Sequence, residues 1–158
     1  MANTLVIREY RASDYSDVVA LNAYGLAAAG VPAESDVYAG DLEDITGTYL
    51  GDGATLLVGE LDHHIVAMGA LRSLDDSTCE ITRMRVAPEA QGRGYGKAIL
   101  ACLEDAARRY GYQHATLLTG PDQHPAIDLY RANGYTTTAN EQHGLLAGVR
   151  MAKSLIIV

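Results

Sequence analysis

The sequence has no phenylalanine, no tryptophan, only two cysteines and no long apolar run. Ten tyrosines supply all of its aromatic side chains, so a tyrosine here is expected first of all to pack in a core. Cys79 and Cys102 form neither a CxxC pair nor a disulfide framework, and two free thiols favour a reducing compartment. No stretch approaches the roughly 20 apolar residues of a membrane span, and the N-terminus lacks the features of a signal peptide. These absences predict a cytoplasmic protein without a membrane partner.

Basic residues are also in the minority, with 12 Lys and Arg against 20 Asp and Glu, which gives a formal net charge of −8. This balance disfavours nucleic acid as a partner and suits a cationic partner such as an amine. The chain has 158 residues and is 48% apolar, enough for one domain, 1–158, with a core of its own.

Hydrophobic periodicity divides the chain into strands and helices. The predicted strands are 4–10, 54–62, 64–74, 78–88, 114–120, 135–139 and 148–158, and the predicted helices are 13–30, 34–47, 92–110 and 124–135. The dipeptide Asp62-His63 predicts a hairpin turn. The resulting order, β-α-α-β-β-β-α-β-α-β-β, indicates an α/β (α+β) protein with a mixed sheet.

The run RVAPEAQGRGYGKAIL places Gly92, Gly94 and Gly96 where a strand gives way to a helix. The first turn of a helix leaves amide groups unpaired and carries partial positive charge. Glycines let an anion come close to those amides. Arg93 and Lys97 add two full positive charges. The segment therefore predicts a phosphate-binding loop.

Two common phosphate-binding motifs do not fit this loop. A Walker loop needs glycine in place of Gln91 and serine or threonine in place of Ala98. The dinucleotide fingerprint needs glycine or alanine in place of Lys97. A third pattern, Q/R-x-x-G-x-G/A, is satisfied by Gln91, Gly94 and Gly96. A nucleotide-binding domain is therefore disfavoured.

With this third pattern the sequence resembles the GNAT superfamily of N-acyltransferases. RMRVAPEAQGRGYGKAIL is similar to that family's acetyl-CoA motif, and AIDLYRANGY is similar to its next block, a short helix ending in Leu-Tyr-x-x-x-Gly-Tyr. The dense part runs from Glu80 to Gly134, and the flanks agree in order and type. The resemblance implies a GNAT-like fold in which two neighbouring central parallel strands, 78–87 and 113–119, splay apart around a pantetheine arm.

The resemblance also implies acetyl-CoA as co-substrate and no metal. Backbone groups of Met84, Arg85 and Val86 are expected to bind the pantetheine. The pyrophosphate is expected at the amides of a continuous stretch: Gln91, Gly92, Arg93, Gly94, Tyr95, Gly96 and Lys97. Gln123 stands where family members often have asparagine, seven residues before the helix tyrosine, and it also bears an amide.

Acyl transfer to an amine needs a group that takes a proton. An alkyl ammonium with a pKa near 10.4 is protonated at pH 7, so a base must act before the amine attacks. Glu80 is the candidate base, directly or through one water, and many GNAT members have a carboxylate at this place. Strand alternation puts it on the face of Thr82 and Met84 unless a bulge intervenes. A salt bridge to Arg72 or Arg83 is the alternative role.

The departing thiolate needs a proton in return, and Tyr130 is the candidate acid. It stands three and four residues after Ile127 and Ala126 on its helix. A phenol with a pKa near 10 is protonated at pH 7 and can donate to a thiolate of pKa about 8.5. The family's tyrosine in this block does so, while core packing is the alternative. His143, in the polar stretch NEQHG, is a reserve base.

These features together predict an N-acetyltransferase that moves an acetyl group from acetyl-CoA to a primary amine of a small molecule or peptide by direct attack in a ternary complex. A catalytically silent acyl-CoA-binding sensor is the alternative. The sequence leaves open the acceptor and the choice between acetyl and a longer acyl group. His63-His64 lacks the ligand spacing of a metal site. The apolar tail SLIIV suits either a homodimer contact or a core strand.

Overall fold

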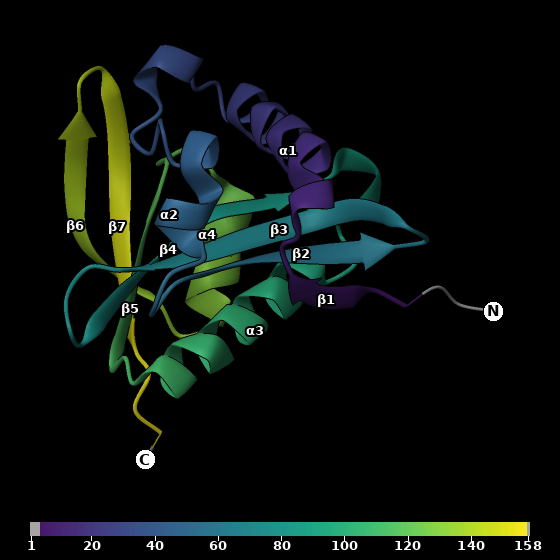
Figure 1. The fold of residues 1–158 in the computed structure, drawn as a ribbon. Coiled ribbons are helices and arrows are strands. Elements are labelled where there is room, and N and C mark those ends of the chain that lie inside the picture. Colours follow the sequence, from purple (N-terminus) through teal and green to yellow (C-terminus); the bar gives the residue numbers. More distant parts are fainter. Residues whose placement is uncertain (1–3, 158) are drawn as a thin grey trace.

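The computed structural model describes residues 4–157. Seven strands form one mixed sheet in the order β1-β2-β3-β4-β5-β7-β6 (Figure 1). The strands are β1 (Val6–Glu9), β2 (Thr55–Leu61), β3 (His64–Ser73), β4 (Thr78–Val86), β5 (His114–Thr119), β6 (Thr136–His143) and β7 (Leu146–Ser154). The helices are α1 (Tyr15–Ala28), α2 (Ile45–Tyr49), α3 (Tyr95–Tyr110) and α4 (His124–Ala132). The predicted order of elements is confirmed.

Helices cover both faces of the sheet (Figure 1). One apolar cluster joins α1 and α2 to one face, and its strand members alternate along β2 as Leu56 and Val58. The second cluster joins α3 and α4 to the opposite face, with Leu57 as its member from β2. Successive side chains of β2 and β3 point to opposite faces, and both faces are covered by helices. The sequences of these two strands are therefore almost continuously apolar.

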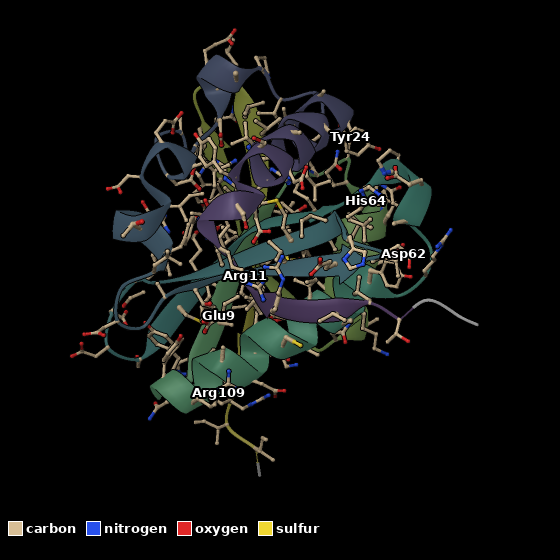
Figure 2. All side chains as sticks on the ribbon, turned by 45° about the vertical axis from the view of Figure 1, so that its right-hand side comes forward. Glu9, Arg11, Tyr24, Asp62, His64 and Arg109 are labelled. Atoms are coloured by element: carbon tan, nitrogen blue, oxygen red, sulfur yellow. The ribbon has the colours of Figure 1, made fainter. Side chains whose placement is uncertain are left out.

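The hairpin between β2 and β3 turns at the predicted dipeptide. Asp62 has a φ of 51° and His63 a φ of 66°, and two left-handed residues form the tight turn that matches the twist of paired strands. Figure 2 shows Asp62 and His64 at this end of the sheet. None of the helices within residues 4–157 is long and apolar enough to cross a membrane.

The helix predicted over 34–47 is wrong for most of its length, since α2 begins only at Ile45. The structure has two 3-10 turns, Ala33–Ser35 and Leu42–Asp44, followed by the short α2. Gly40 between them has a φ of 99°, which ends any helix. The side chains of Asp41 and Asp44 accept hydrogen bonds from nearby backbone amides. Such local bonds favour turns over a continuous helix.

Two further strand predictions differ at their ends. β6 continues through the polar stretch that was expected to be a loop, so His143 is its last residue. Its mostly exposed residues give no apolar alternation to detect. In the tail, Leu155 is buried in the core, while Ile156 and Ile157 lie exposed beyond β7. Residue 158 lies outside the described residues, and a homodimer contact there stays a prediction.

A bulge in β4 changes which side chains share a face. Arg83 has a φ of 56°, and the pairing of β3 with β4 shifts register between Met68 and Ala70. Thr82 still faces α2, where its hydroxyl lies 2.9 Å from that of Tyr49. Met84 packs on the opposite face, against α3. The face expected for Glu80, Thr82 and Met84 is therefore broken by the bulge.

β4 and β5 are the only parallel neighbours in the described sheet, and they separate partway along. They pair from Thr78 with His114 to Ile81 with Leu117. Beyond that point β4 continues to Val86, with β3 still on its other side. The predicted splaying of these two central strands is confirmed.

Candidate active site

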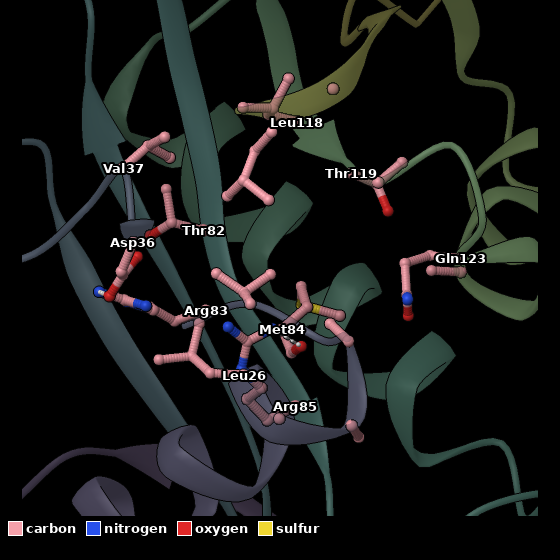
Figure 3. A pocket seen from close by; sticks show the side chains of 18 of the residues that line it. Leu26, Asp36, Val37, Thr82, Arg83, Met84, Arg85, Leu118, Thr119 and Gln123 are labelled. Atoms are coloured by element: carbon pink, nitrogen blue, oxygen red, sulfur yellow. Dashed lines mark hydrogen bonds and ion pairs between the residues drawn. The ribbon is translucent and has the colours of Figure 1, made fainter. Parts of the chain in front are cut away.

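A cavity of about 520 Å³ lies where β4 and β5 separate, within the usual size of small-ligand sites. Figure 3 shows Arg83, Met84 and Arg85 of β4 on one side and Thr119 and Gln123 on the other. The end of α1, the segment that follows it and the β6–β7 hairpin complete the wall. The splayed strands thus form a cleft whose wall is completed by several loops.

The N-terminus of α3 begins beside this cavity. Gly92 and Gly94 have φ values of 77° and 82°, a left-handed conformation that favours glycine. Ala98 makes the first hydrogen bond of the helix, to the carbonyl of Gly94. The amides of the three preceding residues, 95–97, therefore have no acceptor inside the helix.

Positive side chains flank these amides. Arg93 and Lys97 are exposed, and neither forms an ion pair within the described part of the chain. A Cβ on Gly96 would lie 3.4 Å from Leu129 Cδ2, an ordinary contact, so the packing of α3 on α4 does not by itself require glycine here. Free amides and two free cations suit a diphosphate, and the loop therefore fits the expected pyrophosphate of a coenzyme.

The edge of β4 that faces the gap is open beyond Ile81. Gln91 reaches back to this strand, and its Nε2 donates a hydrogen bond to the carbonyl of Val86 at 3.2 Å. This carbonyl is among the groups expected to bind pantetheine. Gln91 and Gln123 both line the cavity, while their contacts with a coenzyme stay predictions.

Tyr130 is only 6% exposed and forms part of the cavity wall. Its ring packs edge-to-face on Tyr135, with 5.9 Å between centroids. Burial raises the pKa of Tyr130 to about 12, and the nearby charge of Arg85 offsets this in part. Tyr130 thus packs in the core, as the alternative held, while its phenol stays protonated beside the cavity.

Glu80 is 2% exposed and does not line the cavity within the described chain. Its Oε1 accepts hydrogen bonds from Arg72, with Nη2 at 2.6 Å. Its Oε2 accepts from Arg150 Nη1 at 2.6 Å and from the Tyr38 hydroxyl at 3.2 Å. Of the two arginines considered for Glu80, Arg72 contacts it, whereas Arg83 pairs with acids elsewhere.

Tyr38 connects Glu80 to the cavity. It lines the wall, and the guanidinium carbons of Arg72 and Arg83 lie 5.3 Å and 5.5 Å from the centroid of its ring. Burial, followed by the charge of Glu80, raises the pKa of Tyr38. Residues 24–49 contain several tyrosines and no motif, so no sequence pattern distinguishes Tyr38 from the others.

His143 lies in the cavity wall at the end of β6. Its Nε2 is 2.9 Å from Glu141 Oε1, and Glu141 also accepts hydrogen bonds from Arg150. Arg150, followed by His143, lowers the pKa of Glu141 to about 2. Ion pairs thus run from Glu80 through Arg150 to Glu141 and hold the hairpin against β4.

The fold and site define a protein with a splayed sheet, a phosphate-binding helix start and a cleft lined by proton-bearing side chains. Residues 25–135 match the sequence model of the Acetyltransferase (GNAT) family, and the chain belongs to that family. The expected family membership and fold are therefore confirmed.

Two relatives and one solved structure illustrate the similarity. N-acetyltransferase family 8 member 2 from Rattus norvegicus is 30% identical over 105 residues, 63% of this chain and 46% of that protein. Mycothiol acetyltransferase from Clavibacter sepedonicus is 29% identical over 136 residues, 85% of this chain and 44% of that protein. The chain thus spans about half the length of these curated relatives. A Salmonella typhimurium structure that holds acetyl-CoA has the same fold, with a TM-score of 0.76, 24% identity, and coverage of 98% of this chain and 95% of that one.

Proposed function

We propose that this chain is an acyl-CoA-dependent N-acyltransferase that moves an acetyl group from acetyl-CoA to a primary amine of a small molecule or peptide. Both substrates bind before the amine attacks. One observation carries the proposal: Gln91 and Tyr130 line the cavity between the splayed strands, and the helix start with unpaired amides follows Gln91 directly in the chain. The acetyl-CoA in a structure of the same fold supports the choice of donor.

The chain's own groups bind the coenzyme along this cleft. Amides of residues 95–97, with Arg93 and Lys97, hold the pyrophosphate, and the open edge of β4 at residues 84–86 holds the pantetheine. Acetyl-CoA, when bound, supplies the acetyl group as a thioester, whose C–S bond breaks as the amine forms its C–N bond. The side chain of Gln91 releases the carbonyl of Val86 to make room.

A proton leaves the acceptor before the attack. Freeing an amine of pKa near 10.4 at pH 7 costs about 4 to 5 kcal/mol, so the site needs a base. The ammonium gives a proton to Tyr38 Oη while Tyr38 passes its own proton to Glu80 Oε2. This route uses Glu80 without exposing it. His143 is the second candidate base because it lines the cavity directly.

Tyr130 acts on the leaving sulfur. Its pKa of about 12 lies above the roughly 8.5 of a thiol, so full proton transfer from the phenol is uphill. Tyr130 therefore stabilises the departing thiolate chiefly by donating a hydrogen bond. The nitrogen gives its second proton to solvent as the amide forms, and the sulfur takes its proton from solvent. The proton-donor role expected for this residue becomes a hydrogen-bond-donor role.

A thiol-release assay with acetyl-CoA and a broad panel of amines tests the proposal, with calorimetry of acetyl-CoA binding beside it. The proposal expects both binding and amine-dependent thiol release. A silent acyl-CoA sensor is the second candidate, favoured by the full set of hydrogen bonds on Glu80, which leaves no free base there. Binding without thiol release across the panel would establish the sensor instead.

A further inference from the structure

Arg85 is an arginine of the cavity wall whose side chain turns toward α1. It follows the bulge in β4, and its Nε lies 3.3 Å from Asn22 Oδ1 on that helix. A Cβ on Gly25 would collide with Cδ of Arg85. Glycine inside a helix costs about 1 kcal/mol relative to alanine. Gly25 therefore makes space for this guanidinium beside the cavity.

Arg85 lacks the acidic partner that its neighbours have. Its Nη1 donates to the carbonyl of Met84 at 3.2 Å, and no carboxylate lies within 4.0 Å of it anywhere in residues 4–157. Arg83, two residues earlier, pairs with Asp36 and Asp41 at 2.7 Å each. Arg72 and Arg150 both pair with Glu80. Arg85 thus has no carboxylate in direct contact at the cavity, and Asp36 and Asp41 favour its charge only from a distance.

The surroundings of Arg85 make that charge costly. Burial, followed by the positive charge of Arg83, lowers the pKa of Arg85. Partly buried charges are normally paired in proteins. A guanidinium has five N–H donors, and two of its nitrogens are in use here, so donors remain for a carboxylate in a two-point contact.

The geometry points to Arg85 as the binding residue for a carboxylate on the amine acceptor, so that the substrates are amino acids rather than neutral amines. This inference rests on the proposed function. The coenzyme is the less suitable partner for Arg85, because its phosphates have Arg93 and Lys97 at the start of α3. The Arg85 side chain lies instead on the α1 face of β4, with Asn22.

Matched acid and amide pairs test the inference: glycine, β-alanine and γ-aminobutyrate, each with its carboxamide. Thiol release gives kcat/KM for each compound with the wild-type protein, Arg85→Gln and Arg85→Lys. Hydrogen bonds to charged groups predict that Arg85→Gln lowers kcat/KM for the best acid about 10- to 100-fold and for its amide less than about 3-fold. Arg85→Lys should keep part of the preference. Comparing each variant with the wild type cancels the different basicities of the amines.

Arg109→Gln is the matched control, because it removes the same charge from the exposed end of α3. Figure 2 shows Arg109 on α3 and Tyr24 on α1, on opposite sides of the sheet. Arg109→Gln should leave the acid-to-amide ratio unchanged. Circular dichroism and thermal melting of all three variants exclude misfolding as the cause of a loss.

The outcomes separate this inference from the proposed function. Equal losses for acid and amide in Arg85→Gln, or a loss confined to acetyl-CoA affinity, overturn the carboxylate role. The carboxylate role is also overturned if the wild-type protein acetylates amides at least as fast as acids and Arg85→Gln does not change that ratio. The transferase proposal stands in that case. If no amine is acetylated, the proposed function fails, and binding is measured instead by titrating each acid and its carboxamide into CoA-saturated protein. An acid that binds more tightly than its amide to the wild type, but not to Arg85→Gln, still supports a carboxylate-binding role for Arg85. Equal binding of acid and amide to the wild type refutes that role.

Discussion

A double-mutant cycle on Tyr38 and Glu80 tests the proposed route by which a proton leaves the cavity. Tyr38→Phe removes the hydroxyl that lies 3.2 Å from Glu80 Oε2, and Glu80→Gln removes the carboxylate that takes up the proton. A general base contributes about 10²- to 10⁴-fold to turnover, so each variant should lower kcat by about that factor. Because both residues serve one transfer, the double variant should be no slower than the slower single variant.

Stability must be measured apart from turnover in this cycle. Removing one partner of a buried ion pair costs about 3–5 kcal/mol. The side chains of Arg72 and Arg150 are 38% and 20% exposed, so solvent relieves part of that cost, and we expect about 3 kcal/mol or less for Glu80→Gln. Tyr38→Phe loses one hydrogen bond, about 1 kcal/mol. Urea unfolding gives both values.

Steady-state thiol release at saturating acetyl-CoA, below the unfolding transition, gives the rates for the cycle. His143→Gln is the comparison, since that residue reaches the cavity without Tyr38. Losses that multiply in the double variant mean that the two residues do not share a proton path. Wild-type turnover in Tyr38→Phe removes the relay outright, and a large loss in His143→Gln then identifies the base.

Three further predictions concern the leaving group, the phosphate-binding loop and acid stability. Tyr130→Phe should lower kcat about 10- to 100-fold, because it removes a hydrogen bond to a charged sulfur. Calorimetry should show an acetyl-CoA affinity within about 2-fold of that of the wild type. Unchanged turnover would exclude Tyr130 from the mechanism. Gly94 and Gly111 lie at the two ends of α3 with φ values of 82° and 92°, and an added Cβ would meet open space at both. Gly94→Ala and Gly111→Ala should therefore each cost about 1–2 kcal/mol of stability, but only Gly94→Ala should weaken acetyl-CoA binding. Equal acetyl-CoA affinities of the two variants would contradict the phosphate-binding role of the loop before α3. The pKa of Glu141 is lowered from its ordinary value near 4.5 to about 2, so the stability that Glu141 contributes is present above about pH 4.5 and is lost as the pH falls toward 2. The difference in free energy of unfolding between wild type and Glu141→Gln, measured with denaturant, should therefore shrink over that range. A difference that stays constant with pH would contradict the ion pair.

Local patterns predicted most of the fold. The alternation of β2 and β3, the Asp62-His63 turn and the amphipathic α3 depend on neighbouring residues, which a sequence shows directly. The glycines before α3 are also recognisable in the sequence, because a left-handed backbone, as at Gly92 and Gly94, favours glycine. The family model confirms the resemblance on which the fold prediction rested.

The rest depends on contacts between distant residues, which local patterns do not encode. Arg150 reaches Glu80 across 70 positions of sequence, so this partner was not predicted. The bulge at Arg83 redirects Met84 within a strand of regular appearance. The helix expected over 34–47 fails because Asp side chains there bond to nearby backbone. The lack of an acid beside Arg85 is visible only once the chain is folded.

The central claim is that a diphosphate-bearing coenzyme binds the amides at the start of α3 and extends between β4 and β5. A titration of ¹⁵N-labelled protein with acetyl-CoA, followed by NMR, measures this most directly. We predict large shifts for the amides of residues 92–97 and of 84–86, with small shifts at the far end of α3. Saturable binding that leaves both segments unmoved would contradict the account.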